Sequence, residues 1–190
     1  MKINFLEIKT KSNLLSLIRL LSAIPLWILL DNFNGYNVRI ITAVLCIAAA
    51  ATDSLDGYLA RKYKEVTELG KIIDPLADKV VVGAVIIKLF IIGEIAPYYL
   101  ILILSRDLVI FIGGVFVSNK LGKVLPSNVL GKITVSNIGI IILLIILQVD
   151  KANIFFMFLY YMSIVLMALS LIAYIIRALE FLKQKEYGNI

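Results

Sequence analysis

The sequence predicts an all-α integral membrane protein with six transmembrane helices, preceded by an interfacial amphipathic segment. Three observations lead to this fold class. The 190 residues are 61% hydrophobic, whereas roughly half is typical of soluble domains. The mean hydropathy is +0.98. Apolar runs of about 20 residues, the length that a helix needs to cross a bilayer, recur along almost the whole chain.

The elements follow from the apolar runs and the polar breaks between them. The first 13 residues, MKINFLEIKTKSN, mix apolar side chains with lysines, which favours a helix lying at the membrane surface. We expect no segment long enough to separate domains, and therefore a single domain over residues 1–190 with a six-helix bundle over 14–182. The spans are expected at about residues 14–30, 39–59, 72–92, 98–117, 129–147 and 154–178.

Charge distribution predicts the orientation of these spans. One side of the predicted bundle carries the N-terminal segment, the 61–71 and 118–132 connections and the C-terminal tail, which together hold most of the lysines. The other side holds only Arg39 and Lys151. Because positive loops stay in the cytoplasm, both termini are expected there, in a multi-pass protein of the cell inner (plasma) membrane. The net charge of +6 then reflects topology and anionic lipid, and no nucleic-acid partner is expected.

The residue types that are absent limit the chemistry. The chain has no histidine, so the commonest general base and metal ligand is excluded. Its one cysteine, Cys46, lies in an apolar run and is expected to be a small buried side chain. Any catalysis must come from carboxylates, lysine, tyrosine or hydroxyl groups.

An acidic stretch interrupts the apolar pattern between Thr52 and Lys79, with the sequence TDSLDGYLARKYKEVTELGKIIDPLADK. Asp53 and Asp56 share one face of the second predicted span. Gly70, Asp74 and Asp78 are each four residues apart and form one stripe if the third helix begins that early. Pro75 leaves two alternatives open, because it is either the first helical residue after an Asp74 cap or a kink within the helix.

Four carboxylates so close together require neutralisation. Like charges repel, and hydration is poor near a membrane. Hard divalent cations suit all-oxygen sites, and two metals about 4 Å apart can clamp a displacement at phosphorus. Gly57, Ala60 and Gly70 remove side-chain bulk where a large ligand must lie against the helix backbone, and Arg61 supplies a fork suited to phosphate oxygens.

The combined spacing resembles the signature of the CDP-alcohol phosphotransferase family. Eight fixed positions match across 26 residues: Asp53, Asp56, Gly57, Ala60, Arg61, Gly70, Asp74 and Asp78. The stretches SNLLSLIRLLSAIP, IIDPLADK and GKIT (131–134) are similar to those of bacterial phosphatidylglycerophosphate synthases. SRDLVI is similar to the cardiolipin synthases of the same family as well.

The resemblance implies a six-helix membrane enzyme of phospholipid synthesis, forming a homodimer. It would move a phosphatidyl group from CDP-diacylglycerol to an alcohol, with glycerol 3-phosphate as the expected acceptor, and release CMP. Two Mg²⁺ or Mn²⁺ ions are implied. Their ligands would be Asp53, Asp56, Asp74 and Asp78, with Asp78 also the catalytic base. The CDP site would contain Asp53, Asp56, Gly57, Ala60, Arg61, Gly70 and Asp74.

An acceptor with a phosphate group needs cationic partners. The candidates are Arg106, Lys120, Lys123 and Lys132, with Arg19 and Arg177 as secondary candidates. Arg106 lies inside an apolar run, where a charge needs a partner, and Asp107 or a motif carboxylate could instead serve it structurally. Counting about 1.5 Å per residue from Tyr98 puts Arg106 roughly 12 Å from the outer end of its span. That depth is nearer the middle of the membrane than the acidic stretch.

Two other functions fit part of the pattern. A cardiolipin synthase would use phosphatidylglycerol, a bulky lipid alcohol, as its acceptor. A divalent-cation transporter would explain the carboxylates, but it would not explain Gly57, Ala60, Arg61 and Gly70 at fixed offsets. A transporter site would also favour the middle of the bilayer over one edge. The transporter is therefore the remote alternative.

Overall fold

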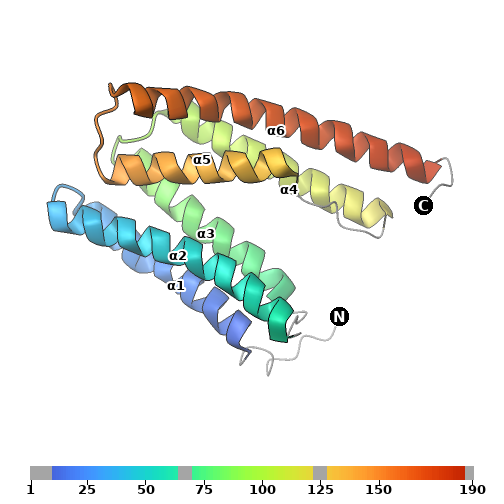
Figure 1. The fold of residues 1–190 in the computed structure, drawn as a ribbon, viewed down its shortest axis with the longest axis horizontal. Coiled ribbons are helices and arrows are strands. Elements are labelled where there is room, and N and C mark those ends of the chain that lie inside the picture. Colours follow the sequence, from blue (N-terminus) through green and yellow to red (C-terminus); the bar gives the residue numbers. More distant parts are fainter. Residues whose placement is uncertain (1–9, 64–69, 122–127, 187–190) are drawn as a thin grey trace. The chain divides into compact units, whose positions relative to one another are not determined.

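The computed structural model describes residues 10–63, 70–121 and 128–186, and in these ranges the chain forms six α-helices and no strand (Figure 1). The helices occupy the six predicted regions. Their bounds are α1 Lys11–Asp31, α2 Tyr36–Tyr63, α3 Gly70–Ile91, α4 Pro97–Leu121, α5 Val129–Ile146 and α6 Ile154–Glu186.

Several helices extend beyond the predicted spans, most clearly α1, α2, α4 and α6. Helix α1 begins at Lys11 because the Thr10 hydroxyl accepts a hydrogen bond from the Asn13 backbone N–H at 3.4 Å, which caps the first turn. Its first residues therefore belong to the segment predicted to lie at the membrane surface, and residues 1–9 of that segment lie outside the described ranges. Helix α6 continues to Glu186, beyond the predicted end of the sixth span at about residue 178.

The chain divides into two compact units, Met1–Ile95 and Ala96–Ile190. In the first unit, α1 packs against both α2 and α3, and Figure 1 shows α1 and α2 running side by side. Leu26, Leu30 and Leu89 are fully buried in its core. The buried Lys88 of α3 forms an ion pair with Asp31 at the end of α1, which fixes the register of these two helices.

In the second unit, α6 packs against α4 and α5. Hydrogen bonds link α6 to both of these helices. Thr134 of α5 donates to the Leu166 carbonyl of α6 at 3.2 Å, and the hydroxyls of Tyr99 on α4 and Ser163 on α6 lie 2.7 Å apart. Such hydrogen bonds are common between membrane helices, where water cannot satisfy a polar group.

Helix length and composition identify a membrane protein. Four helical segments in the described ranges are long and apolar enough to span a bilayer: Asn13–Asp31, Pro97–Val117, Val129–Ile146 and Ile154–Lys183. Helix α2 contributes a shorter apolar stretch, Tyr36–Thr52. Large apolar side chains are exposed on all six helices, as expected for surfaces that face lipid. The predicted all-α membrane fold class is confirmed.

Candidate active site

The acidic motif divides between two helices of the first unit. Helix α2 carries Asp53 and Asp56 near its C-terminal end, and α3 carries Asp74 and Asp78 near its N-terminal end. Figure 1 shows these two helix ends, and the beginning of α1, at the same end of the unit. The fold therefore gathers the two halves of the motif at one end of a three-helix unit.

On α2 the motif positions 53 and 56 lie on the same helical face as buried residues nearer the start of the helix. Thr42 is buried, Cys46 and Ala49 are half-buried, and Ile47 is exposed. Steps of four and three residues lead from Thr42 through Cys46 and Ala49 to positions 53 and 56, which is one helical face. That face belongs to a helix packed against α1. Gly57, Ala60 and Arg61 follow in the last turns of α2, and the side chains from Asp56 to Arg61 lie outside the described part of the chain.

On α3 the structure decides between the two alternatives for Pro75. The helix begins at Gly70, so Pro75 lies within it and Asp74 is not the N-cap. Gly70, Asp74 and Asp78 are consequently one stripe, spaced four residues apart. This stripe lies beside the buried residues Ala77 and Val81.

The donor set of the motif fits a hard divalent cation, because all four side chains offer only carboxylate oxygens. Asp78 is exposed at the surface of the chain and takes part in an interaction with another residue. The side chains of Asp53, Asp56 and Asp74 lie outside the described residues. Among the side chains that the structure does describe, no group of three or more His, Cys, Asp or Glu could hold a metal ion.

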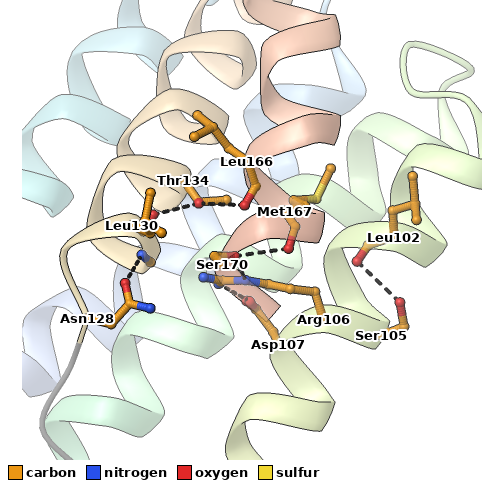
Figure 2. A network of polar contacts seen from close by, with 11 residues as sticks. Leu102, Ser105, Arg106, Asp107, Asn128, Leu130, Thr134, Leu166, Met167 and Ser170 are labelled. Carbon is orange, nitrogen blue, oxygen red and sulfur yellow. Dashed lines mark hydrogen bonds and ion pairs between the residues drawn. The ribbon is translucent and has the colours of Figure 1, made fainter. Parts of the chain in front are cut away.

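A second polar cluster lies in the other unit, around Arg106 of α4 (Figure 2). The residue is only 7% exposed. Its Nη1 donates to Asp107 Oδ1 at 2.6 Å, and its Nε donates to Ser170 Oγ of α6 at 3.3 Å. The remaining nitrogen, Nη2, lies 3.4 Å from the position that a Cβ would have at Gly131. The Arg106 guanidinium is thus held between all three helices of its unit.

This position differs from the depth that residue counting suggested. Gly131 is in the first turn of α5, where the Asn128 side chain accepts from its backbone N–H at 2.8 Å. The Arg106 guanidinium therefore lies at the end of α5 that joins the lysine-containing 118–132 connection. Counting along α4 misses this, because the start of α4 does not mark the level at which α5 begins.

The lysine candidates differ in what the structure describes. Lys132 is exposed in the first turn of α5, next to Gly131. Lys120 belongs to the last turn of α4, with its side chain outside the described residues, and Lys123 lies wholly outside them.

Sequence reasoning missed two polar residues of α1, Asn13 and Ser16, and considered Arg19 of the same helix only as a secondary acceptor candidate. Asn13, Ser16 and Arg19 are 2%, 0% and 2% exposed, so all three are buried in a helix that spans a membrane. Their spacing of three residues puts them along one side of the helix. That spacing inside an otherwise apolar run was the available signal.

The chain is similar to a known protein family. The family model described as CDP-alcohol phosphatidyltransferase matches residues 9–177. The chain belongs to the CDP-alcohol phosphatidyltransferase family. The match crosses both units, and it includes the motif helices, the Arg106 cluster and the α1 face.

Individual relatives within the CDP-alcohol phosphatidyltransferases resemble the chain over shorter stretches. A Rickettsia bellii protein named CDP-diacylglycerol–glycerol-3-phosphate 3-phosphatidyltransferase is 42% identical over 98 residues, covering 52% of this chain and 54% of the relative. An Aquifex aeolicus protein of the same name is 39% identical over 111 residues, covering 57% and 60%. A Mycoplasma pneumoniae protein, also of that name, is 49% identical over 70 residues, covering 37% and 31%. The chain thus matches little more than half the length of the first of these relatives.

Proposed function

We propose that the protein is a phosphatidyltransferase that uses CDP-diacylglycerol as donor and glycerol 3-phosphate as acceptor. The observation that carries the proposal is the complete motif, divided between the last turns of α2 and the first turns of α3 in a chain of this family. The names of the relatives support glycerol 3-phosphate over phosphatidylglycerol as the acceptor.

The four aspartates are proposed to form the reaction centre. Asp53, Asp56, Asp74 and Asp78 would bind two divalent cations, Mg²⁺ or Mn²⁺. Bound there, the cations would offset the negative charge of the donor pyrophosphate and of the departing CMP. Gly57, Ala60 and Gly70 would leave room for the nucleotide, and Arg61 would bind phosphate oxygens as a fork.

The proposed reaction is one displacement at phosphorus. Asp78 accepts the proton of the acceptor hydroxyl, and that oxygen forms a bond to the phosphorus that carries diacylglycerol. The bond between this phosphorus and the oxygen of CMP breaks, and CMP leaves with the electron pair. The new phosphodiester remains in the membrane, and the proton on Asp78 passes to solvent. No histidine is needed, which agrees with the composition.

Arg106 is proposed to bind the phosphate of the acceptor. The Lys and Arg distribution assigns the acidic motif and the 118–132 connection to the cytoplasmic side. Because the Arg106 guanidinium lies beside the first turn of α5, it would also be near that side. Ser170 and Asp107 hold two of its nitrogens, and Lys132, together with Lys120 and Lys123, would add positive charge.

We expect Arg106→Ala to raise the KM for glycerol 3-phosphate at least tenfold with little change in the KM for CDP-diacylglycerol. A charge-assisted hydrogen bond is worth about 1.5–3 kcal/mol, and about 1.4 kcal/mol corresponds to a factor of ten. Steady-state kinetics with each substrate varied in turn measures both constants. Arg39→Gln is the matched control, since Arg39 donates to the Phe33 and Asn34 carbonyls in the α1–α2 turn, at the opposite end of its helix from the motif.

Two results would contradict the acceptor role of Arg106. An equal loss for both substrates would indicate a structural pair with Asp107. No loss for either would leave the acceptor site to the lysines and would favour a bulky lipid acceptor.

The proposal also includes the location of the protein in the membrane, the number of domains and the oligomeric state. We expect a multi-pass protein of the inner (plasma) membrane with both termini and the site in the cytoplasm. The family match across residues 9–177 supports one functional domain, with all six helices spanning the bilayer. A homodimer, implied by the family resemblance, stays a prediction.

An acceptor screen tests the proposed function. Purified protein, CDP-diacylglycerol and Mg²⁺ are incubated with glycerol 3-phosphate, phosphatidylglycerol, glycerol or no alcohol, and CMP release is measured. Release that depends on glycerol 3-phosphate is expected. Release with phosphatidylglycerol alone would identify a cardiolipin synthase, and no release with any alcohol would refute the transferase.

A further inference from the structure

Two hydrogen-bonded pairs with the same sequence separation join helices α4 and α6. The hydroxyls of Tyr99 and Ser163 lie 2.7 Å apart, and they are separated by 64 residues. Arg106 Nε donates to Ser170 Oγ at 3.3 Å, again across 64 residues. The second pair lies about two helical turns beyond the first on both helices. Because the separation is constant, α4 and α6 run in the same direction through this contact.

Both serines are held by the backbone of their own helix. Ser163 donates to the Tyr160 carbonyl at 2.6 Å. Ser170 donates to the Met167 carbonyl at 3.0 Å. A hydroxyl has a single proton, so each oxygen is left to accept a hydrogen bond from α4. Ser163 and Ser170 are 0% and 1% exposed, which makes each of them a buried acceptor with a fixed direction.

The two pairs differ in the donors that the α4 side chain has left. Tyr99 has one hydroxyl proton, and the contact with Ser163 uses it. The Arg106 guanidinium carries N–H donors on all of its nitrogens. Ser170 accepts from Nε and Asp107 from Nη1, whereas no residue in the described ranges accepts from Nη2. The Arg106 pair therefore leaves a charged donor group available.

Ser170 determines the direction in which this remaining nitrogen points. A guanidinium is planar, so holding Nε and Nη1 also fixes the position of Nη2, beside Gly131 in the first turn of α5. Asp107 belongs to the same helix as Arg106 and its side chain is 42% exposed, so water competes for it. Ser170 is the buried contact from another helix, and Figure 2 shows it reaching Arg106 from α6.

We propose that Ser170 is a positioning residue for the acceptor alcohol, acting through Arg106. The inference rests on the proposed function, in which Arg106 binds the phosphate of glycerol 3-phosphate. Holding Nε removes rotamer freedom from the arginine before the acceptor binds, so less entropy is lost on binding. Ser170 is buried and does not itself contact the acceptor.

The test measures CMP release by the full chain in detergent or lipid, with each substrate varied in turn. Ser170→Ala is expected to raise the KM for glycerol 3-phosphate about threefold to tenfold, the usual effect of one hydrogen bond. The KM for CDP-diacylglycerol should stay at the parental value. Ser170→Thr should recover most of the loss, because a helical threonine keeps the hydroxyl and can still bond a carbonyl one turn earlier.

A double-mutant cycle with Arg106→Ala distinguishes positioning from packing. A residue that acts only through the guanidinium has no further effect once the guanidinium is absent. The double variant Arg106→Ala, Ser170→Ala is therefore expected to have the same acceptor KM as Arg106→Ala alone. An equal further rise in both backgrounds would overturn the inference, since a packing effect does not need the guanidinium.

Ser163→Ala is the matched control. It removes a buried hydroxyl from the same α4–α6 contact, but its partner is Tyr99. Both KM values should remain parental. A rise in acceptor KM as large as that of Ser170→Ala would show a general loosening of the two helices and would overturn the inference. If Ser170→Ala does not fold, Ser170→Cys replaces it, because sulfur is a weak acceptor of similar size.

Three outcomes separate this inference from the proposed function. A parent that releases no CMP in the acceptor screen refutes the transferase and, with it, the role of Ser170. An active parent in which Arg106→Ala keeps the parental acceptor KM refutes the acceptor role of Arg106 and the positioning role together. A raised acceptor KM in Arg106→Ala, with parental values in folded Ser170→Ala or Ser170→Cys, refutes only the positioning role.

Discussion

Asp78→Asn is expected to lower kcat by about 10²–10⁴-fold, the usual contribution of a positioned general base. The amide keeps the size of the side chain and one oxygen, but it cannot accept the proton of the acceptor hydroxyl. Donor binding should therefore persist while turnover is lost. Asp78 is an exposed residue on the first turns of α3, so the substitution buries no new polar group and should leave the fold intact.

Measurement of this effect needs kcat and donor binding from the same preparation. Single-turnover CMP release gives the chemical step, and equilibrium binding of CDP in the presence of Mg²⁺ reports on the donor site. Asp150→Asn is the matched control, because Asp150 lies in the α5–α6 turn and accepts from the Ala152 backbone N–H at 2.9 Å. Turnover of Asp78→Asn within about tenfold of the parent would exclude a base worth 10²–10⁴ in rate.

Removal of divalent metal is expected to have the second large effect. Exhaustive chelation should reduce CMP release by roughly 10³-fold or more, since a metal stabilises developing charge by several kcal/mol and each 1.36 kcal/mol is a factor of ten. The carboxylates of the motif would otherwise repel a pyrophosphate brought to the same end of the unit. Adding back Mg²⁺ or Mn²⁺ should restore the rate.

Titration of the metal tests which residues bind it. Asp53→Asn should raise the Mg²⁺ concentration needed for half-maximal rate, because it removes one negative charge from the donor set. Asp150→Asn should leave that concentration unchanged. Full turnover after chelation, or a parental Mg²⁺ requirement in Asp53→Asn, would contradict a metal site built from the motif.

The positions of the helices could be predicted because they depend on local composition. Apolar runs of membrane-spanning length, broken by polar turns, specify a helix wherever they occur, and all six observed helices fall in the predicted regions. The first and last residues of the helices could be predicted less accurately, because they depend on single capping groups such as the Thr10 hydroxyl. The pairing of Asp53 with Asp56 on α2, and of Asp74 with Asp78 on α3, could also be predicted locally, because residues three or four positions apart share a helix face.

Contacts between distant parts of the chain required the tertiary structure. Arg106 and Ser170 meet across 64 residues of sequence, and Lys88 meets Asp31 across 57. A polar residue in an apolar run can face lipid, a neighbouring helix or a site, and sequence spacing does not distinguish these surroundings. The sequence by itself thus determined the membrane fold class, the helix positions and the acidic motif, because these follow from hydropathy and helical period. Only helix packing decided that the Arg106 guanidinium reaches the first turn of α5 and that the polar face of α1 is buried, because burial depends on which helices pack together and in what register.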